Sequence, residues 1–159
     1  MTQRVDLATV MDRLAIDEVV TGYAVAVDDG DWEAYRALFA PGGRADYSSA
    51  GGLEGPAGEV ADWLAETMKL FPVRQHLIVN RLIRLADLGG SPGDSAEVRA
   101  DFVNPMRLAG TDDAGAAGAV TAPNFIAAGR YAFALVRTPY AGWRLSRVTV
   151  HEKWRHMSA

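Results

Sequence analysis

The sequence has no cysteine among its 159 residues and only three histidines. The lack of cysteine excludes a disulfide framework, a thiolate nucleophile and a cysteine-based zinc site. His76, His151 and His156 do not have the spacing of a metal-binding pair. No glycine-rich phosphate loop follows an expected strand, and Ser48-Ser49 lacks the context of a nucleophile elbow. Candidate chemistry therefore rests on histidine, carboxylate and phenol groups.

The chain also lacks an excess of positive charge and a long apolar run. Its net charge is −4, whereas a dedicated nucleic-acid-binding domain shows a basic face. The first residues do not form the apolar core of a signal peptide, and no apolar run is long enough to span a bilayer. We therefore expect a cytoplasmic protein that binds neither nucleic acid nor membranes.

The first part of the sequence is predicted to be helical. Asp6 is a candidate N-cap for a long helix that runs to about Asp28 and stops at Gly30. Two shorter helices are expected at 32–39 and 58–70. The apolar positions of the first helix recur at helical spacing: Leu7, Val10, Met11, Leu14, Ile16, Val19, Val20, Tyr23 and Val27.

The later part alternates between apolar and polar residues, which is the period of β-strands. A segment rich in alanine, glycine and aspartate, 110–123, is expected to be a hairpin loop. Helices followed by long antiparallel strands predict an α+β fold, with a curved, mostly antiparallel sheet wrapped around the helices and enclosing one pocket. The whole chain, 1–159, fits one domain. Strands are expected at 44–48, 73–87, 96–108, 125–137 and 143–154.

The end of the first helix carries a phenol and a carboxylate beside an apolar face. Asp28 lies four residues after Ala24, so it projects near that face, and Tyr23 is close by. A carboxylate in such a place suits a proton carrier. The alternative is that Asp28, Asp29 and Asp31 simply end one helix and begin the next.

Two further polar residues are expected on inward faces of strands. His76 shares a strand face with Ile78, Asn80 and Leu82, and a histidine there could shuttle a proton near neutral pH. The alternative is a structural histidine. Asn104 interrupts an apolar strand face, and a buried amide needs a partner in protein, water or ligand.

The order of motifs resembles the SnoaL-like family of the nuclear transport factor 2-like superfamily, which folds as an α+β cone. Residues 23–32 resemble its signature of a tyrosine, an aspartate and an aspartate-tryptophan pair. Segments 44–47 and 74–76 resemble its first strand and its histidine strand, and 142–143 with 152–154 resemble its last strand. The closest pattern is that of the scytalone dehydratase and bile-acid dehydratase branch.

The resemblance implies roles for individual residues. Asp28 would hold His76, which would act as general acid and base. Tyr23 and Tyr47 would polarise a carbonyl or hold a water molecule. Enzymes of this branch use neither a metal nor an organic cofactor, so none is expected, and the superfamily often forms homodimers through the outer face of the sheet.

The resemblance also implies residues that bind substrate. Asn104 falls about where dehydratases have a second acidic or imidazole group, but an amide cannot carry a proton at neutral pH. Lys153 falls near a basic residue close to the pocket. The expected apolar lining consists of Val20, Ala24, Phe102, Met106 and Phe133.

The leading functional hypothesis is a cofactor-independent dehydratase or isomerase that acts on a small apolar oxygenated ring or polyketide-like molecule. Such an enzyme would use Asp28 and His76 as a dyad in a closed pocket. Two alternatives remain open, since a fold does not decide a function. One is an epoxide hydrolase or polyketide cyclase of the same fold, and the other is a non-catalytic module that binds a small molecule or a partner.

Overall fold

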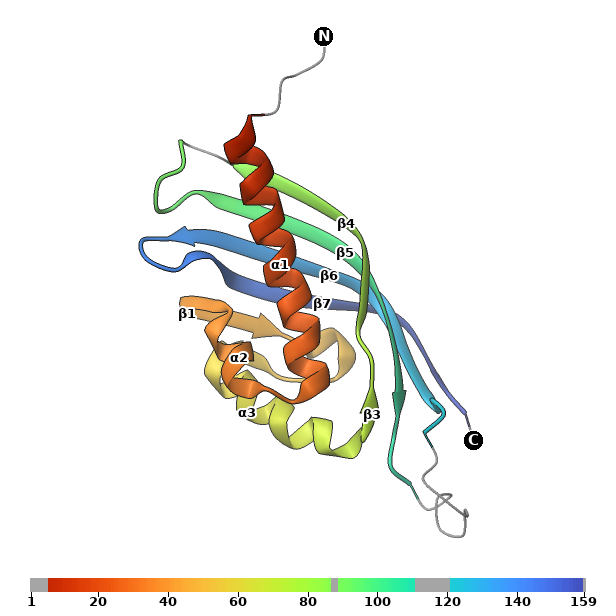
Figure 1. Cartoon of the computed structure of the whole chain (residues 1–159). Helices are drawn as coiled ribbons and strands as arrows, with labels where there is room; N and C mark the ends of the chain where they lie inside the picture. Colours follow the sequence, from red (N-terminus) through yellow and green to blue (C-terminus); the bar gives the residue numbers. More distant parts are fainter. Residues whose placement is uncertain (1–5, 87–88, 111–120, 159) are drawn as a thin grey trace.

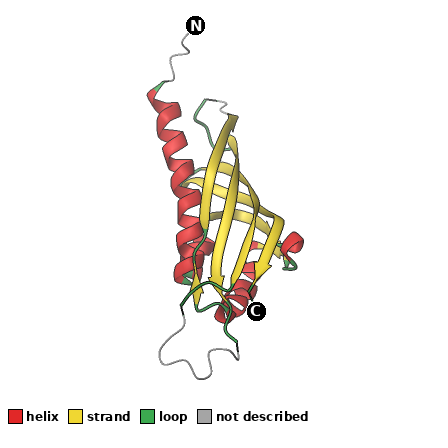
Figure 2. Cartoon of the chain, turned by 90° about the vertical axis from the view of Figure 1, so that its right-hand side faces the viewer, coloured by secondary structure: helices red, strands yellow, loops and turns green. Residues whose placement is uncertain are grey.

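The computed structural model describes residues 6–86, 89–110 and 121–158. A curved sheet forms one layer, and the helices cover one of its faces (Figures 1 and 2). The helices are α1 (Leu7–Asp29), α2 (Trp32–Ala37) and α3 (Ala57–Thr67), with 3₁₀ turns η1 (Ser48–Ala50) and η2 (Met68–Leu70). The strands are β1 (Phe39–Asp46), β2 (Glu54–Pro56), β3 (Val73–Arg74), β4 (Leu77–Ala86), β5 (Ser95–Arg107), β6 (Phe125–Thr138) and β7 (Gly142–Met157).

The sheet has the strand order β2-β1-β7-β6-β5-β3, and β4 also pairs with β5. All neighbours are antiparallel except β1 and β7, which are parallel. The predicted α+β fold with a curved, mostly antiparallel sheet is confirmed. None of the helices in the described ranges is long and apolar enough to cross a membrane.

Helix α1 begins and ends where the sequence predicts. The Asp6 carboxylate accepts a hydrogen bond from Thr9 N at 2.8 Å, which satisfies one of the free N–H groups of the first turn. Gly30 ends the helix with φ 67°, a left-handed conformation that costs glycine little. From Ile16 onward, the apolar face of α1 packs against the sheet.

The first turns of α1 differ from the prediction, because their apolar residues face solvent. The inward position in this part belongs to Asp12, whose carboxylate accepts hydrogen bonds from Arg137 Nη1 at 2.9 Å and Nη2 at 2.7 Å. Trp143 Nε1 donates to the same carboxylate at 3.0 Å. An ion pair and a hydrogen bond therefore hold the start of α1 against the sheet. The apolar residues of its first turns that are exposed are Leu7, Val10, Met11 and Leu14.

We expect Asp12→Asn to lower the free energy of unfolding by roughly 2 kcal/mol at pH 7, as is typical of hydrogen bonds to charged groups. Hydrogen bonding to Arg137 holds the pKa of Asp12 below its usual 3.8, against a smaller opposing effect of burial. A depressed pKa in the folded state stabilises the protein above the unfolded pKa, and this stabilisation is lost as the pH falls through the folded pKa. Urea unfolding of parent and variant should therefore differ at pH 7, and the difference should begin to shrink as the pH falls below about 4.

The matched control for Asp12 is Glu18→Gln, because Glu18 is exposed on the same helix. It should leave the stability of the protein unchanged within about 0.5 kcal/mol. A stability difference between Asp12→Asn and the parent that persists undiminished at pH 3 would contradict the ion-pair explanation.

The strand predicted at 73–87 is interrupted twice, and its last residue lies outside the described part. It divides between β3 and β4, and Asn80 has φ 52° at a register shift of the β4–β5 pairing. Asparagine tolerates this left-handed conformation better than most residues do. After the bulge the inward face changes, so Asn80 and Leu82 point outward. The expectation that they share a face with His76 and Ile78 was wrong.

Other boundaries move by a few residues. β1 begins at Phe39 rather than at 44, and α2 correspondingly ends at Ala37. Helix α3 ends at Thr67, where a 3₁₀ turn continues to Leu70. The alternation predicted for 96–108 is confirmed along β5. Most of the hairpin loop expected at 110–123 lies outside the described residues.

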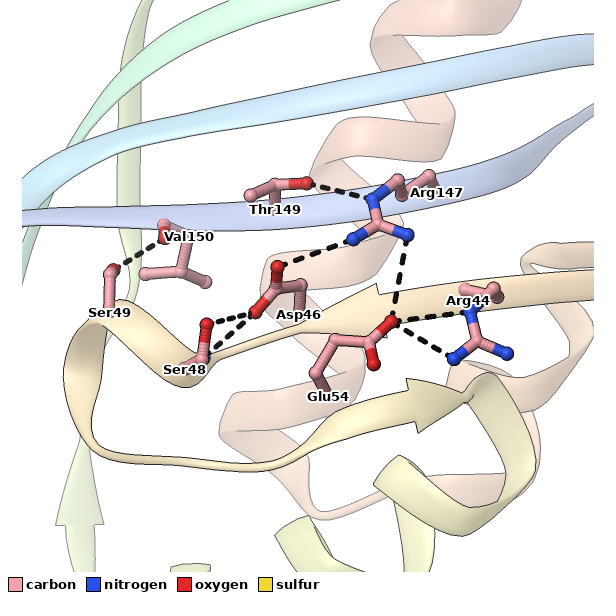
Figure 3. Close-up of polar contacts among 8 residues, drawn as sticks. All are labelled: Arg44, Asp46, Ser48, Ser49, Glu54, Arg147, Thr149 and Val150. Carbon is pink, nitrogen blue, oxygen red and sulfur yellow. Dashed lines mark hydrogen bonds and ion pairs between the residues drawn. The ribbon is translucent and has the colours of Figure 1, made fainter.

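A polar network ties η1 to the neighbouring strands (Figure 3). Arg147 on β7 contacts Asp46 at 3.3 Å and Glu54 at 3.7 Å, which joins β7, β1 and β2. Ser49 Oγ donates to Val150 O at 2.5 Å and accepts from Glu152 N at 3.0 Å. These bonds hold η1 against β7, next to the cavity described below.

Candidate active site

A cavity of about 310 Å³ lies between the inner face of the sheet and the helices. Its walls come from α1, α3, η1, η2 and the strands β5, β6 and β7. Apolar side chains dominate the walls, as is usual for sites that bind small molecules. The polar side chains of the lining are Tyr23, Tyr47, Thr67, His76, Asn104, Tyr131, Glu152 and Arg155.

Asp28 contacts His76, which forms part of the wall of this cavity. Asp28 occupies the last turn of α1, and its Oδ1 lies 2.6 Å from His76 Nδ1. Both carboxylate oxygens also accept from the backbone N–H of His76, at 3.1 and 2.9 Å. That N–H is free for Asp28 because sheet pairing is interrupted between β3 and β4, where His76 lies.

A second contact fixes the end of α1 relative to His76. Arg74 Nε donates to Val27 O at 2.9 Å, and its Nη1 donates to Met68 O and Phe71 O at 3.0 and 3.1 Å. One arginine therefore links α1, η2 and the segment that carries His76. The side chain of His76 is 8% exposed and that of Asp28 is 21% exposed, so water screens their contact only partly.

The dyad geometry determines which imidazole nitrogen is available. A carboxylate at Nδ1 accepts the Nδ1 proton, which favours the tautomer with a lone pair on Nε2. His76 borders the cavity, and because Asp28 occupies Nδ1, Nε2 is the ring nitrogen left for a bound molecule. The arrangement can accept a proton at Nε2 while Asp28 stabilises the resulting cation.

A cluster of buried phenols lies beside the dyad. The hydroxyls of Tyr23 and Tyr47 are hydrogen-bonded, and Tyr35 Oη lies 3.2 Å from Tyr47 Oη. Tyr131 packs edge-on against Tyr23 with ring centroids 5.4 Å apart. Burial raises the pKa of Tyr131 to about 12, and it also raises the pKa values of Tyr23 and Tyr47 well above the usual value. These hydroxyls therefore stay protonated near neutral pH and act as donors.

The structure brings most of the expected site residues to one cavity. Tyr23, Tyr47 and Asn104 border it together with His76, as do Phe102 and Met106, whereas Asp28 lies behind His76 and does not line the cavity. By contrast, three residues of the expected apolar lining lie in the packed core rather than at the cavity. These residues are Val20, Ala24 and Phe133.

Lys153 lies outside the cavity, in contrast to the expectation. The β6–β7 register shifts at Gly129, which pairs with Glu152 while Ala128 pairs with Trp154, so Lys153 is the extra residue of a bulge. Its Nζ is 4.0 Å from Asp101 Oδ1. Beyond the bulge Arg155 borders the cavity instead, where it binds Glu152 at 2.8 Å.

Tyr131 also borders the cavity, although it was not among the expected site residues. Its position could have been predicted from the sequence. It falls on the inward face of the strand predicted at 125–137, two residues before Phe133, so strict alternation places it there. The position of Arg155 at the cavity could not be predicted in this way, because a bulge cannot be located from alternation alone.

The model of the SnoaL-like domain matches residues 8–149. The chain belongs to the SnoaL-like family. Among curated proteins, this SnoaL-like chain is 31% identical over 104 residues to the uncharacterised protein Rv2910c of Mycobacterium tuberculosis. That alignment covers 65% of this chain and 67% of the relative.

Solved structures with the same fold include two whose names describe a dehydratase and a dehydrochlorinase. A Novosphingobium aromaticivorans protein described as a candidate scytalone dehydratase superposes with a TM-score of 0.67 at 18% identity, covering 94% of this chain and 89% of the other. The hexachlorocyclohexane dehydrochlorinase LinA Type2 superposes with a TM-score of 0.71 at 16% identity, covering 94% and 93%. At these identities the likeness to both structures establishes the fold of this SnoaL-like domain.

Proposed function

We propose that this protein is a cofactor-independent acid/base enzyme, a dehydratase or isomerase that acts on a small apolar oxygenated ring or polyketide-like molecule. The observation that carries the proposal is the contact of Asp28 with His76 Nδ1 at the wall of a largely apolar cavity. A purely structural histidine does not require a cavity of about 310 Å³ next to it.

The proposed reaction begins with transfer of a proton from the carbon next to a carbonyl to His76 Nε2. Asp28 stabilises the imidazolium, and a neutral phenol of the tyrosine cluster donates a hydrogen bond to the enolate oxygen. In dehydration, the enolate re-forms the carbonyl, the C–O bond to a hydroxyl on the next carbon breaks, and the proton from His76 leaves with that hydroxyl as water. In isomerisation, His76 returns the proton to a different carbon.

Two neighbours in fold are named for reactions of related type. In loss of water and in loss of hydrogen chloride alike, a proton is removed from one carbon and a group leaves from the adjacent carbon. The names of the scytalone dehydratase-like protein and of LinA therefore support elimination chemistry as the reaction class. The carboxylate–imidazole pair supplies the base that such a reaction needs.

Hydrogen–deuterium exchange tests the proposed proton transfer without knowledge of the natural substrate. The probes are 2-tetralone and 1-indanone in D₂O, with proton NMR following the loss of signal at the carbon next to the carbonyl. Binding of each probe is verified first by shifts of the cavity resonances. We expect exchange well above the buffer rate. A probe that binds in the cavity but exchanges no faster than in buffer would contradict the proposal.

A further inference from the structure

Tyr35 on α2 carries a hydroxyl group that is buried behind the wall of the cavity. The residue is fully buried and does not line the cavity, whereas Tyr23 and Tyr47 both do. Its ring packs among aromatic neighbours, with its centroid 5.1 Å from that of Phe39 and 5.8 Å from that of Tyr23. A phenylalanine ring would fill the same space. Because burial of a hydroxyl is costly unless it is hydrogen-bonded, packing alone does not explain the oxygen of Tyr35.

The direction of the hydrogen bond between Tyr35 and Tyr47 follows from the partners that the Tyr35 hydroxyl has. The two oxygens are 3.2 Å apart, and within the described part of the chain this hydroxyl has no other partner. If Tyr47 were the donor, the Tyr35 proton would be buried without an acceptor, which is unfavourable. Tyr35 is therefore the donor and Tyr47 the acceptor. Burial raises the pKa of Tyr35 above its usual value, so its proton is present at neutral pH.

The three hydroxyls together supply one hydrogen-bond donor to the cavity. Tyr35, Tyr47 and Tyr23 have three hydroxyl protons and two mutual hydrogen bonds. Because the Tyr35 proton is used within the cluster, the remaining proton belongs to Tyr47 or to Tyr23, both of which border the cavity. In either case it lies at the end of a chain of hydrogen bonds that begins at Tyr35. A hydroxyl that accepts one hydrogen bond donates the next one more strongly.

We propose that Tyr35 is a positioning residue of the candidate active site, which acts through Tyr47 to direct and strengthen the phenol hydrogen bond that a ligand carbonyl receives in the cavity. This inference rests on the proposed function for the carbonyl. The Tyr35 proton occupies one acceptor position of Tyr47, so the last proton of the chain is left to point into the cavity. The same bond polarises the donor at the place where an enolate oxygen needs stabilisation.

Tyr35→Phe removes the first donor of this chain and keeps the aromatic ring. Cooperative strengthening amounts to about 10–30% per bond and a donor to an oxyanion contributes roughly 10²- to 10³-fold, so α-proton exchange of bound 2-tetralone should slow by roughly two- to eightfold. The affinity for 2-tetralone and the urea midpoint should change little, because the ring contacts are retained. Proton NMR in D₂O measures the exchange rate.

Infrared difference spectroscopy of bound 2-tetralone detects the hydrogen bond at its carbonyl oxygen without any reaction. A donated hydrogen bond lowers the carbonyl stretching frequency, so Tyr35→Phe should raise this frequency relative to the parent. Replacement of Tyr35 by 3-fluorotyrosine, which is a stronger donor of almost the same size, should lower it. A residue that only fills space would not produce opposite shifts in the two variants.

The matched control is Tyr140→Phe, which removes a phenol oxygen from a side chain that is fully exposed between β6 and β7. It should change neither the exchange rate nor the carbonyl frequency. An unchanged carbonyl frequency in Tyr35→Phe, or shifts of the same sign in both Tyr35 variants, would overturn the assignment of Tyr35.

The two readouts separate this inference from the acid/base proposal. The infrared shift requires a bound ketone but no proton transfer, so it should persist in His76→Gln. A carbonyl frequency that depends on Tyr35 without ketone exchange would contradict the catalytic proposal alone. Ketone exchange with a frequency that does not depend on Tyr35 would contradict the assignment of Tyr35 alone. Failure of both 2-tetralone and 1-indanone to bind would contradict both.

Discussion

Replacing His76 by glutamine is expected to slow α-proton exchange of a bound ketone by about 10²- to 10⁴-fold, the usual contribution of a positioned general base. Glutamine keeps the size and polarity of the side chain but offers no basic nitrogen. Its amide N–H can still donate to Asp28, whose carboxylate also retains its bonds from the backbone N–H of residue 76. The fold should survive, so the loss should appear in the exchange rate and not in probe affinity.

The matched control is His151→Gln, because His151 is exposed on β7 and does not border the cavity. It should leave the exchange rate unchanged. Equal rates in His76→Gln and the parent, with both proteins folded and binding the probe, would remove His76 from the chemistry.

Replacing Gly129 by alanine is expected to cost the fold at least about 2–3 kcal/mol, the upper part of the range for overpacked sites. An added Cβ would lie 2.1 Å from His151 O, 2.9 Å from Glu152 Cα and 2.9 Å from Lys153 N. All three atoms belong to the backbone of β7, so no side-chain rotation can relieve the clash. Urea unfolding followed by circular dichroism measures the loss.

The Gly129 substitution should also disturb the cavity, because the bulge opposite Gly129 sets the register that brings Arg155 to its wall. The control is Gly58→Ala in α3, where an added Cβ meets nothing within 4 Å. Alanine there is expected to stabilise the helix by about 0.5–1 kcal/mol. If Gly129→Ala unfolded at the same urea concentration as the parent, the close approach of β6 and β7 would be refuted.

The end of α1 is an example of a feature that the local sequence pattern predicts. Asp6 and Gly30 mark the helix termini by their chemistry, so the position of Asp28 in the last turn follows from the sequence. The inward positions of β5 follow equally from alternation, which places Asn104 on the face of Phe102 and Met106. The predicted fold is confirmed because long helical and alternating segments carry strong signals.

The positions of side chains that depend on irregular backbone could not be predicted from the local pattern. The bulge at Lys153 moves that side chain out of the cavity and Arg155 to its wall, and the bulge at Asn80 reverses the face of β4. Both depend on pairing with a neighbouring strand and not on the local pattern. The exposed start of α1 has a related cause, since the partner of Asp12 is Arg137, which lies 125 residues away.

The tautomer of His76 tests the central claim most directly, since the proposed chemistry needs a bare Nε2 facing the cavity. Nitrogen-15 NMR of the neutral imidazole distinguishes a protonated Nδ1 from a protonated Nε2. We predict that the parent carries its proton on Nδ1, bonded to Asp28, and that Asp28→Asn weakens this preference. A parent protein with the proton on Nε2 would contradict the account, because its His76 could not accept a proton from a molecule in the cavity.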